Sequence, residues 1–367
     1  MINVKHIALA PLFEPFALGS IALANRLVMA PMSRNRADHR DAPHALTVRY
    51  YAQRATAGLI VTEAAPITSS ARASTGAPGI YSDAQIAGWR RVTAAVHAAN
   101  GRIFLQLWHA GRISSPHLQP DGAPPVAPSA VPAEGFLPGA AGPEPFVTPR
   151  ALGLDEIAAL IGQFALAARN ARRAEFDGVE IHAANGYLVD QFLRDGSNYR
   201  SDAYGGPADR RRRFLAEILD ATIAVWGEGR VGVRLSPASS HNSMSDSDPE
   251  ATFGAAAAAL NDWPLAYLHV DETANIPFDW TKFRRNYRGV YMANSGYDAA
   301  KAATAVAQGH ADLIGLGVLF LANPDLVARL RWGAELNVPD RKTFYGGDHR
   351  GYTDYPSLDG IDPTPPH

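Results

Sequence analysis

Cysteine is absent from this chain of 367 residues. Its absence excludes disulfide bonds and thiolate catalysis, and it is typical of proteins of the reducing cytoplasm. The first residues, Met1–His6, lack the charged-then-apolar pattern of a signal peptide. No apolar run approaches the roughly 20 residues that a membrane span needs. We therefore expect a cytoplasmic protein with no membrane partner.

An excess of charge of one sign is also lacking, because the formal net charge is −2. This balance predicts neither a nucleic-acid partner nor binding to a membrane surface. The hydrophobic fraction of 47% and the charged fraction of 19% suit a large soluble core. The length suits one elaborated α/β barrel. We expect a small-molecule partner and a monomer or homodimer.

One stretch, residues 177–187, organises the rest of the chain. Its apolar run Val179–Ile181 follows a glycine and predicts a buried strand. Three polar side chains follow within six residues: His182, Asn185 and Tyr187. In a (β/α)8 barrel the active site is built at that end of each strand. The stretch therefore predicts one wall of a catalytic pocket.

Short apolar runs and helical stretches alternate along the whole chain. The predicted strands are residues 26–31, 58–63, 102–109, the run within 177–187, 230–235, 265–270, 289–292 and 312–316. The predicted helices are residues 43–57, 84–99 with Asp83 as N-cap, 154–174, 208–226, 249–260, 298–308 and 324–332. Eight strands that alternate with helices predict a parallel sheet closed into a single α/β domain, a (β/α)8 TIM barrel.

Three segments do not belong to this alternation of strands and helices. Residues 1–25 are expected to form an N-terminal cap, and residues 333–367 a polar C-terminal extension. Residues 113–150 hold ten of the 27 prolines and show little periodicity. A stretch of that length inside a compact chain is usually functional. We expect it to be a lid-like excursion over the C-terminal face of the barrel.

The barrel prediction gathers a set of polar and aromatic residues on one face. Gln106, Arg234 and Ser33 together suit a flat ring with heteroatoms along its edge. Glutamine can both donate and accept hydrogen bonds, and a permanent cation stabilises negative charge on a reduced ring. Ala64 and Trp108 end neighbouring strands and line the same face.

The same strand ends carry residues that other chemistries use. A metal held by His182, His269 and Asp271 lacks a compact ligand cluster, and no G-x-S-x-G elbow indicates a hydrolase. Glu63 and Asp271 could be a glycosidase pair, although Glu63 is expected to cap a neighbouring backbone. His109 and His269 are interpreted as hydrogen-bonded structural residues.

Seven motifs, in order and at fixed spacing, resemble the Old Yellow Enzyme family of FMN-dependent ene reductases. The similarity runs from about residue 12 to the C-terminus. The motifs are MAPMSR at 29–34, LQLWHAGR at 105–112, VEIHAANGY at 179–187, NYRSDAYGG at 198–206, VRLSP at 233–237, ANPDL at 322–326 and FYGG at 344–347.

The resemblance implies a role for each matching position. His182 and Asn185 would bind the carbonyl oxygen of an activated alkene, and Tyr187 would protonate its α-carbon. NAD(P)H would reduce FMN before the alkene takes the hydride. The flavin ring would be bound by Ser33, the backbone of Ala64, Gln106 and Arg234. The FMN phosphate would be bound by loops that contain Ser295, Gly296 and Gly317. The substrate cavity would be lined by Trp108, Ser74 and Tyr345.

The chain departs from the family pattern at the phosphate. An arginine usually follows the strand-eight glycine, but Val318 follows Gly317 here, and the strand-seven loop begins Asn294-Ser295 instead of being glycine-rich. Losing a guanidinium removes a strong contact to phosphate and predicts weakened FMN affinity. Ser74 stands where many bacterial members of the family carry an aromatic residue that lines the substrate pocket. The run Arg210–Arg213 is interpreted as a solvated helix start, or as a source of a compensating guanidinium.

Three functional hypotheses remain open. The first is an FMN-dependent reductase of an electron-poor alkene. The second keeps His182, Asn185 and Tyr187 but has lost tight FMN, which would make it a redox-neutral isomerase or cyclase acting on a carbonyl compound. The third is a non-catalytic binding protein, and the complete polar triad argues against it.

Overall fold

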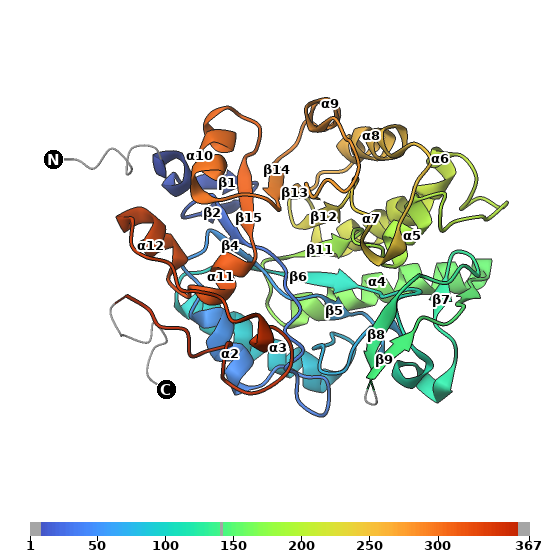
Figure 1. Ribbon diagram of the computed structural model, residues 1–367, viewed down its shortest axis with the longest axis horizontal. Coiled ribbons are helices and arrows are strands. Elements are labelled where there is room, and N and C mark those ends of the chain that lie inside the picture. Colours follow the sequence, from blue (N-terminus) through green and yellow to red (C-terminus); the bar gives the residue numbers. More distant parts are fainter. Residues whose placement is uncertain (1–8, 140–141, 359–367) are drawn as a thin grey trace.

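A closed barrel of eight parallel strands forms the centre of the molecule (Figure 1). The computed structural model describes residues 9–139 and 142–358. In order around the barrel the strands are β3 (Leu27–Met29), β4 (Leu59–Val61), β6 (Ile103–Trp108), β11 (Gly178–His182), β12 (Val231–Leu235), β13 (Tyr267–Asp271), β14 (Tyr291–Asn294) and β15 (Leu313–Leu316). Because β15 pairs with β3, the ring is closed. The predicted (β/α)8 architecture is confirmed.

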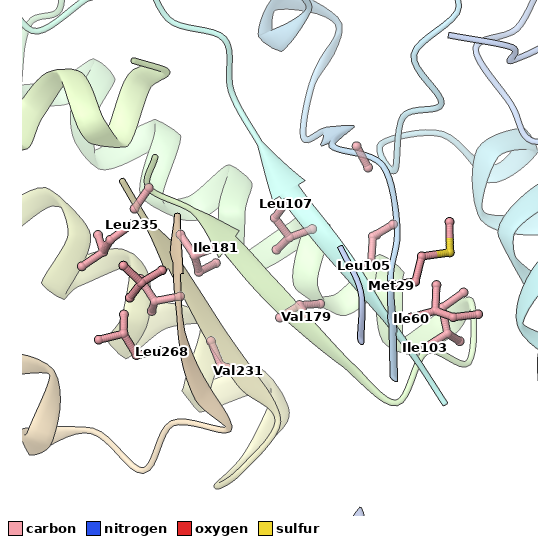
Figure 2. Close-up of a cluster of buried hydrophobic side chains, with 14 of the residues drawn as sticks. Met29, Ile60, Ile103, Leu105, Leu107, Val179, Ile181, Val231, Leu235 and Leu268 are labelled. Carbon is pink, nitrogen blue, oxygen red and sulfur yellow. The ribbon is translucent and has the colours of Figure 1, made fainter. Parts of the chain in front are cut away.

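Helices surround the barrel. They are α2 (Ala45–Ala52), α3 (Asp83–Ala98), α4 (Leu154–Arg173), α7 (Arg213–Trp226), α8 (Pro249–Ala259), α9 (Trp280–Asn286), α10 (Ala299–Ala307) and α12 (Leu326–Trp332). Alternate strand residues pack against them, and Figure 2 shows Leu105, Leu107, Val179 and Ile181 in this outer cluster. Phe104, the residue before Leu105, faces the opposite way and belongs to a separate cluster inside the barrel. Two-residue periodicity thus separates the two cores.

Some predicted helix boundaries were wrong. Ser82, not Asp83, caps α3, because its hydroxyl accepts from the backbone N–H of Gln85 and the Gln85 side chain reciprocates. The predicted helix 208–226 is divided at Arg212 into α6 (Ala208–Arg211) and α7.

Three short helices were not predicted: α5 (Leu188–Leu193), α9 and α11 (Val318–Ala322). Each has seven residues or fewer, which is too short to display a periodic apolar face.

An N-terminal hairpin lies at the end of the barrel opposite the active face. Its strands are β1 (Phe16–Leu18) and β2 (Ile21–Leu23). Leu18, Ile21 and Leu23 pack with the interior side chains of the barrel strands. The hairpin of the segment 1–25 therefore closes the bottom of the barrel, while residues 1–8 lie outside the described chain.

The proline-rich segment 113–150 contains more structure than its sequence indicates. It forms a hairpin of β8 (Phe136–Gly139) and β9 (Gly142–Pro145), and β7 (Val126–Ala127) pairs with β10 (Arg150–Ala151). Two short 3-10 helices, Pro116–Leu118 and Pro120–Gly122, precede them. In Figure 1 the hairpin lies beyond the arrowhead of β6. Residues 140–141 are outside the description.

The C-terminal segment is fastened to the loop after β3 by two buried arginines. Arg34 donates from Nη2 to the carbonyl oxygen of Gly351 at 2.7 Å, and Arg36 donates to that of Thr343 at 2.8 Å. The predicted extension 333–367 is described only as far as residue 358. Within the described chain, no helix is long and apolar enough to cross a membrane.

Candidate active site

The turn after β11 is held in a strained conformation by its surroundings. Asn185 has φ 59° and Gly186 has φ 75°. The backbone N–H of Asn185 donates to Ser236 Oγ at 2.7 Å, and that of Gly186 donates to Asp190 Oδ2 at 2.8 Å. A Cβ at Gly186 would lie 2.8 Å from the Cβ of Asn242, so only glycine fits. These contacts aim the turn into the mouth of the barrel.

Three rings meet at this turn. The ring of Tyr187 stands edge-on to those of His182 and Trp108, with centroid distances of 5.0 Å in both cases. His182 Nδ1 and Trp108 Nε1 are buried and have no hydrogen-bond partner among the described residues. Together with the ring of Tyr187 these two rings form one wall at the turn after β11.

Both ionisable rings of this wall are neutral near pH 7. Burial, followed by the charges of Arg234, His269 and His241, lowers the pKa of His182 well below its ordinary value. Burial raises the pKa of Tyr187, and a hydrogen bond with Asn242 opposes part of that rise. A neutral imidazole and a protonated phenol can each donate one hydrogen bond.

Arg234, on β12, is fixed by two acceptors. Its Nη2 donates to Asp271 Oδ2 at 3.0 Å and to Asn294 Oδ1 at 3.1 Å. Burial acts to raise the pKa of Asp271, but Arg234 and bonds from Thr273 and Ser295 outweigh it and leave that pKa lowered. Asp271 is thus an ionised partner of Arg234.

Asn294 was expected in the phosphate loop, and the structure corrects this. It is the last residue of β14 and is 7% exposed. Besides accepting from Arg234, it donates from Nδ2 to the carbonyl oxygen of Gly315 at 2.7 Å. Its carboxamide therefore belongs to the barrel interior. Ser295 and Gly296, both with φ 72°, form the loop itself.

Gln106 contacts a buried carboxylate. Its Nε2 donates to Glu180 Oε1 at 2.7 Å, and Glu180 Oε2 lies 2.9 Å from His269 Nδ1. Glu180 was predicted only as part of the apolar run 179–181, which is wrong for its side chain, because alternate residues of a strand face opposite sides. The charge in the middle of that run was the signal in the sequence. His269 is a hydrogen-bonded structural residue, as expected.

Glu63 caps a backbone turn, as predicted. Its Oε2 accepts from the N–H groups of Arg34 at 2.9 Å and Asn35 at 3.2 Å. His109 is also structural: the N–H of Gly111 donates to its Nδ1 at 3.0 Å. The described residues contain no group of three or more His, Cys, Asp or Glu side chains arranged to hold a metal.

The other predicted residues lie in loops that follow barrel strands and in the C-terminal segment. Ser33 is exposed after β3, and Ala64, 7% exposed, follows β4. A Cβ at Gly317 would lie 3.3 Å from Met32 Sδ, so the two strand-end loops touch. Ser74 donates from Oγ to Asn35 Oδ1 at 3.1 Å. Tyr345 is 68% exposed and borders a cavity of about 500 Å³ between the C-terminal segment and Arg36.

Val318 is the first residue of α11 and is 43% exposed. The arginines at 211–213 do not reach it. Arg211 is buried and donates to the carbonyl oxygens of Leu193 and Gly206, while Arg212 and Arg213 pair with Asp209 and Glu217. In Figure 1, α6 and α11 lie on opposite sides of the molecule. The idea that this run supplies a compensating guanidinium was wrong for these three residues.

A loop after β12, residues 241–244, was missed as part of the site. Asn242, with φ 58°, donates from Nδ2 to the carbonyl oxygen of Asn185 at 2.8 Å. Arg112 donates to the carbonyl oxygens of Asn242 and Ser243 and also to that of Val131 in the proline-rich segment. No local pattern marks Asn242, because the contact joins residues 57 positions apart.

The proline-rich segment reaches the catalytic turn. Ile113, Ala133 and Leu137 are buried together, and Tyr187 packs against them. The N–H of Glu134 donates to Ser243 Oγ at 2.9 Å. The segment therefore covers one side of Tyr187 with apolar atoms.

Comparison with known proteins agrees with this geometry. The chain matches the NADH:flavin oxidoreductase / NADH oxidase family over residues 11–337. It is 42% identical over 364 residues to putative 12-oxophytodienoate reductase 2 of Oryza sativa subsp. japonica, covering 96% of this chain and 95% of that protein. It is 43% identical over 359 residues to a probable flavin mononucleotide-dependent alkene reductase of Leishmania infantum, covering 95% and 97%.

Solved structures show the same relationship. Morphinone reductase in complex with tetrahydroNAD is 47% identical with a TM-score of 0.91, over 95% of this chain and 98% of that one. The Old Yellow Enzyme homologue from Zymomonas mobilis is 41% identical with a TM-score of 0.92, over 95% and 99%. This chain therefore belongs to the NADH:flavin oxidoreductase family of Old Yellow Enzyme-type barrels, whose members are FMN-dependent oxidoreductases.

Proposed function

We propose that this enzyme uses FMN and NAD(P)H to reduce a C=C bond conjugated to a carbonyl group. The observation that carries the proposal is the neutral imidazole of His182 beside the protonated phenol of Tyr187, at the end of β11 and in the turn after it. A hydrogen-bond donor and a proton donor on one wall suit a carbonyl compound that becomes an enolate and is then protonated.

The described residues fit FMN. Gln106 and Arg234 are buried at the barrel mouth, and Arg234 Nε has no partner in the described part of the chain. We assign the ring to these two residues with Ser33 and the backbone of Ala64. The loops containing Ser295, Gly296 and Gly317 would hold the phosphate. When bound, FMN reduced by NAD(P)H supplies the hydride for the β-carbon of the alkene.

His182 and Asn185 would bind the carbonyl oxygen. Within the described chain, the bonds that hold Asn185 are made by its backbone N–H and C=O, so the turn is fixed without using its carboxamide. Two donors on the oxygen stabilise the charge that develops there as the hydride reaches the β-carbon. Because the site is buried and preorganised, each donor acts more strongly than in water.

Tyr187 would protonate the α-carbon. Its raised pKa keeps the phenol protonated at neutral pH. The packing of Ile113, Ala133 and Leu137 against it limits the access of water. A positioned acid of this kind typically contributes 10²–10⁴-fold to the rate. Trp108, Ser74 and Tyr345 would shape the space for the substrate.

The deciding experiment is spectroscopic. We would add FMN to the purified protein, dialyse it and record the absorbance, then follow NADPH oxidation with and without a simple enone such as 2-cyclohexenone. Retained flavin absorbance and enone-dependent NADPH oxidation are expected. A protein that retains no flavin and oxidises no NADPH would refute the proposal.

A second candidate is favoured by the exposed, apolar Val318 beside Gly317. With weak FMN binding, His182, Asn185 and Tyr187 could act as a redox-neutral isomerase or cyclase on a carbonyl compound. Apoprotein that catalyses exchange of the α-protons of a saturated ketone in D₂O would support this function. A cytoplasmic location and a monomer or homodimer remain predictions, and size-exclusion chromatography tests the latter.

A further inference from the structure

A charged side chain lies in the interior of the barrel below the proposed ring site. Glu180, in the middle of β11, has an exposure of 0%, and its neighbours Gln106 and His269 are 1% and 0% exposed. A buried carboxylate is costly unless its oxygens are paired. Each oxygen of Glu180 has its own partner, Gln106 Nε2 at 2.7 Å and His269 Nδ1 at 2.9 Å.

Glu180 is ionised in this setting. Burial acts to raise its pKa, but His269, Arg234 and Gln106 together leave that pKa lowered. Burial also lowers the pKa of His269, more than its pairing with Glu180 raises it. An ionised carboxylate only accepts hydrogen bonds. Neutral His269 must therefore carry its hydrogen on Nδ1, and Gln106 must direct its nitrogen toward Glu180.

This pairing removes an ambiguity that glutamine normally has. The two ends of a carboxamide are similar in shape, and only the hydrogen-bond network decides which end is nitrogen. With Nε2 committed to Glu180, the carbonyl oxygen Oε1 is the end that can accept from a second partner. The isoalloxazine ring of FMN has one imide N–H, and its other edge heteroatoms in the oxidised form are acceptors.

We propose that Glu180 is a positioning residue that holds Gln106 with its carbonyl oxygen presented to the imide N–H of FMN. The inference rests on the proposed contact between Gln106 and the ring. It implies that the protein stabilises the neutral imide, because an acceptor bonded to an N–H opposes loss of that proton. Arg234, assigned to the same ring, acts in the opposite sense, because a cation favours the deprotonated imide. The contribution of Gln106 is therefore read from the change in imide ionisation between the unmodified protein and variants that keep Arg234.

The first measurement uses the unmodified holoprotein. Its flavin absorbance is titrated from neutral to alkaline pH beside free FMN. The same titration is made on Gln106→Leu, which keeps Arg234, and we expect the imide of the bound cofactor to ionise at least one pH unit lower in that variant. An equal or higher ionisation pH in Gln106→Leu would overturn the inference.

The second measurement uses Glu180→Gln, whose amide can donate to Gln106 Oε1 and so permit the inverted carboxamide. We expect the FMN dissociation constant to rise at least tenfold and the imide to ionise at a lower pH than in the unmodified protein. The matched control is Asp246→Asn, which removes another buried carboxylate, paired with Arg211 outside the barrel interior. It should bind FMN as the unmodified protein does.

A double-variant cycle separates positioning from a general structural effect. In a Gln106→Leu background, Glu180→Gln should change FMN affinity less than twofold, because there is no carboxamide left to orient. An equal loss in both backgrounds would overturn the inference. Unchanged FMN affinity in Gln106→Leu alone would instead refute the ring contact of Gln106 on which the inference rests.

Discussion

The rings of His182 and Tyr187 stand edge to face, with their centroids 5.0 Å apart and their planes inclined by 71°. The proposed carbonyl donor and the proposed proton donor therefore share one wall of the barrel mouth. They come from the end of β11 and from the turn after it, so backbone bonds to Ser236 and Asp190 set their separation. This relationship makes their roles separable by mutation.

Replacing Tyr187 by phenylalanine should slow alkene reduction by roughly 10²- to 10⁴-fold, because the ring stays and only the proton donor is lost. Binding of a non-reactive carbonyl ligand should change little, since His182 and Asn185 are intact. Stopped-flow measurement of the oxidative half-reaction and a ligand titration check the two parts. Unchanged turnover would remove Tyr187 from the mechanism.

Asn242→Ala should loosen the catalytic turn. It removes the bond to the carbonyl oxygen of Asn185 and the bond that opposes the rise in the pKa of Tyr187. One such hydrogen bond contributes roughly 0.5–1.5 kcal/mol, so the affinity for a carbonyl ligand should fall about two- to tenfold. The alkaline limb of the kcat profile should move to higher pH. Equal ligand affinity and an unmoved limb would contradict the assignment.

Val318→Arg should tighten FMN binding. A charge-assisted bond to phosphate contributes roughly 1.5–3 kcal/mol, which corresponds to about ten- to a hundredfold in the dissociation constant. The position is half-exposed at the start of α11, so a long side chain can be accommodated without entering the core. Fluorescence titration with FMN measures the change. Val318→Met, which is long but uncharged, is the control, and identical affinities for both variants would place the phosphate elsewhere.

Acid should destabilise the protein through His109. Burial lowers the pKa of this imidazole to about 4, whereas in the unfolded chain it titrates near 6.5. Between these values only the unfolded state binds the proton. Neutral His109 therefore makes its full contribution to the free energy of unfolding above about pH 6.5. As the pH falls toward 4, that contribution decreases by roughly 3 kcal/mol.

Urea unfolding at a series of pH values tests this prediction. His182 and His269 also have lowered pKa values, so a pH dependence will remain in any variant. His109→Gln retains an acceptor for the N–H of Gly111 and removes the titrating ring. Its free energy of unfolding should fall less steeply between pH 6.5 and 4, and parallel curves for the two proteins would refute the assignment.

The barrel could be predicted because its strands are buried on both faces. Parallel strands of this kind are continuous apolar runs, and helices with one apolar face follow them. Glu180 lies within one of these runs, and although its charge distinguishes it from its neighbours, the sequence did not show which buried residues it would contact. The seven-residue helix α9 was missed because it contains too few turns to reveal a period.

The sequence by itself determined the barrel and the polar side chains at the C-terminal end of its fourth strand, β11. Apolar periodicity and the order of strand-end residues are local properties, and His182, Asn185 and Tyr187 lie within six positions. Only the tertiary structure decided that Glu180 orients Gln106, that Asn294 holds Arg234, and that Asn242 supports the turn. Those contacts join residues 57 to 74 positions apart, and closure of the barrel, not local pattern, brings them together.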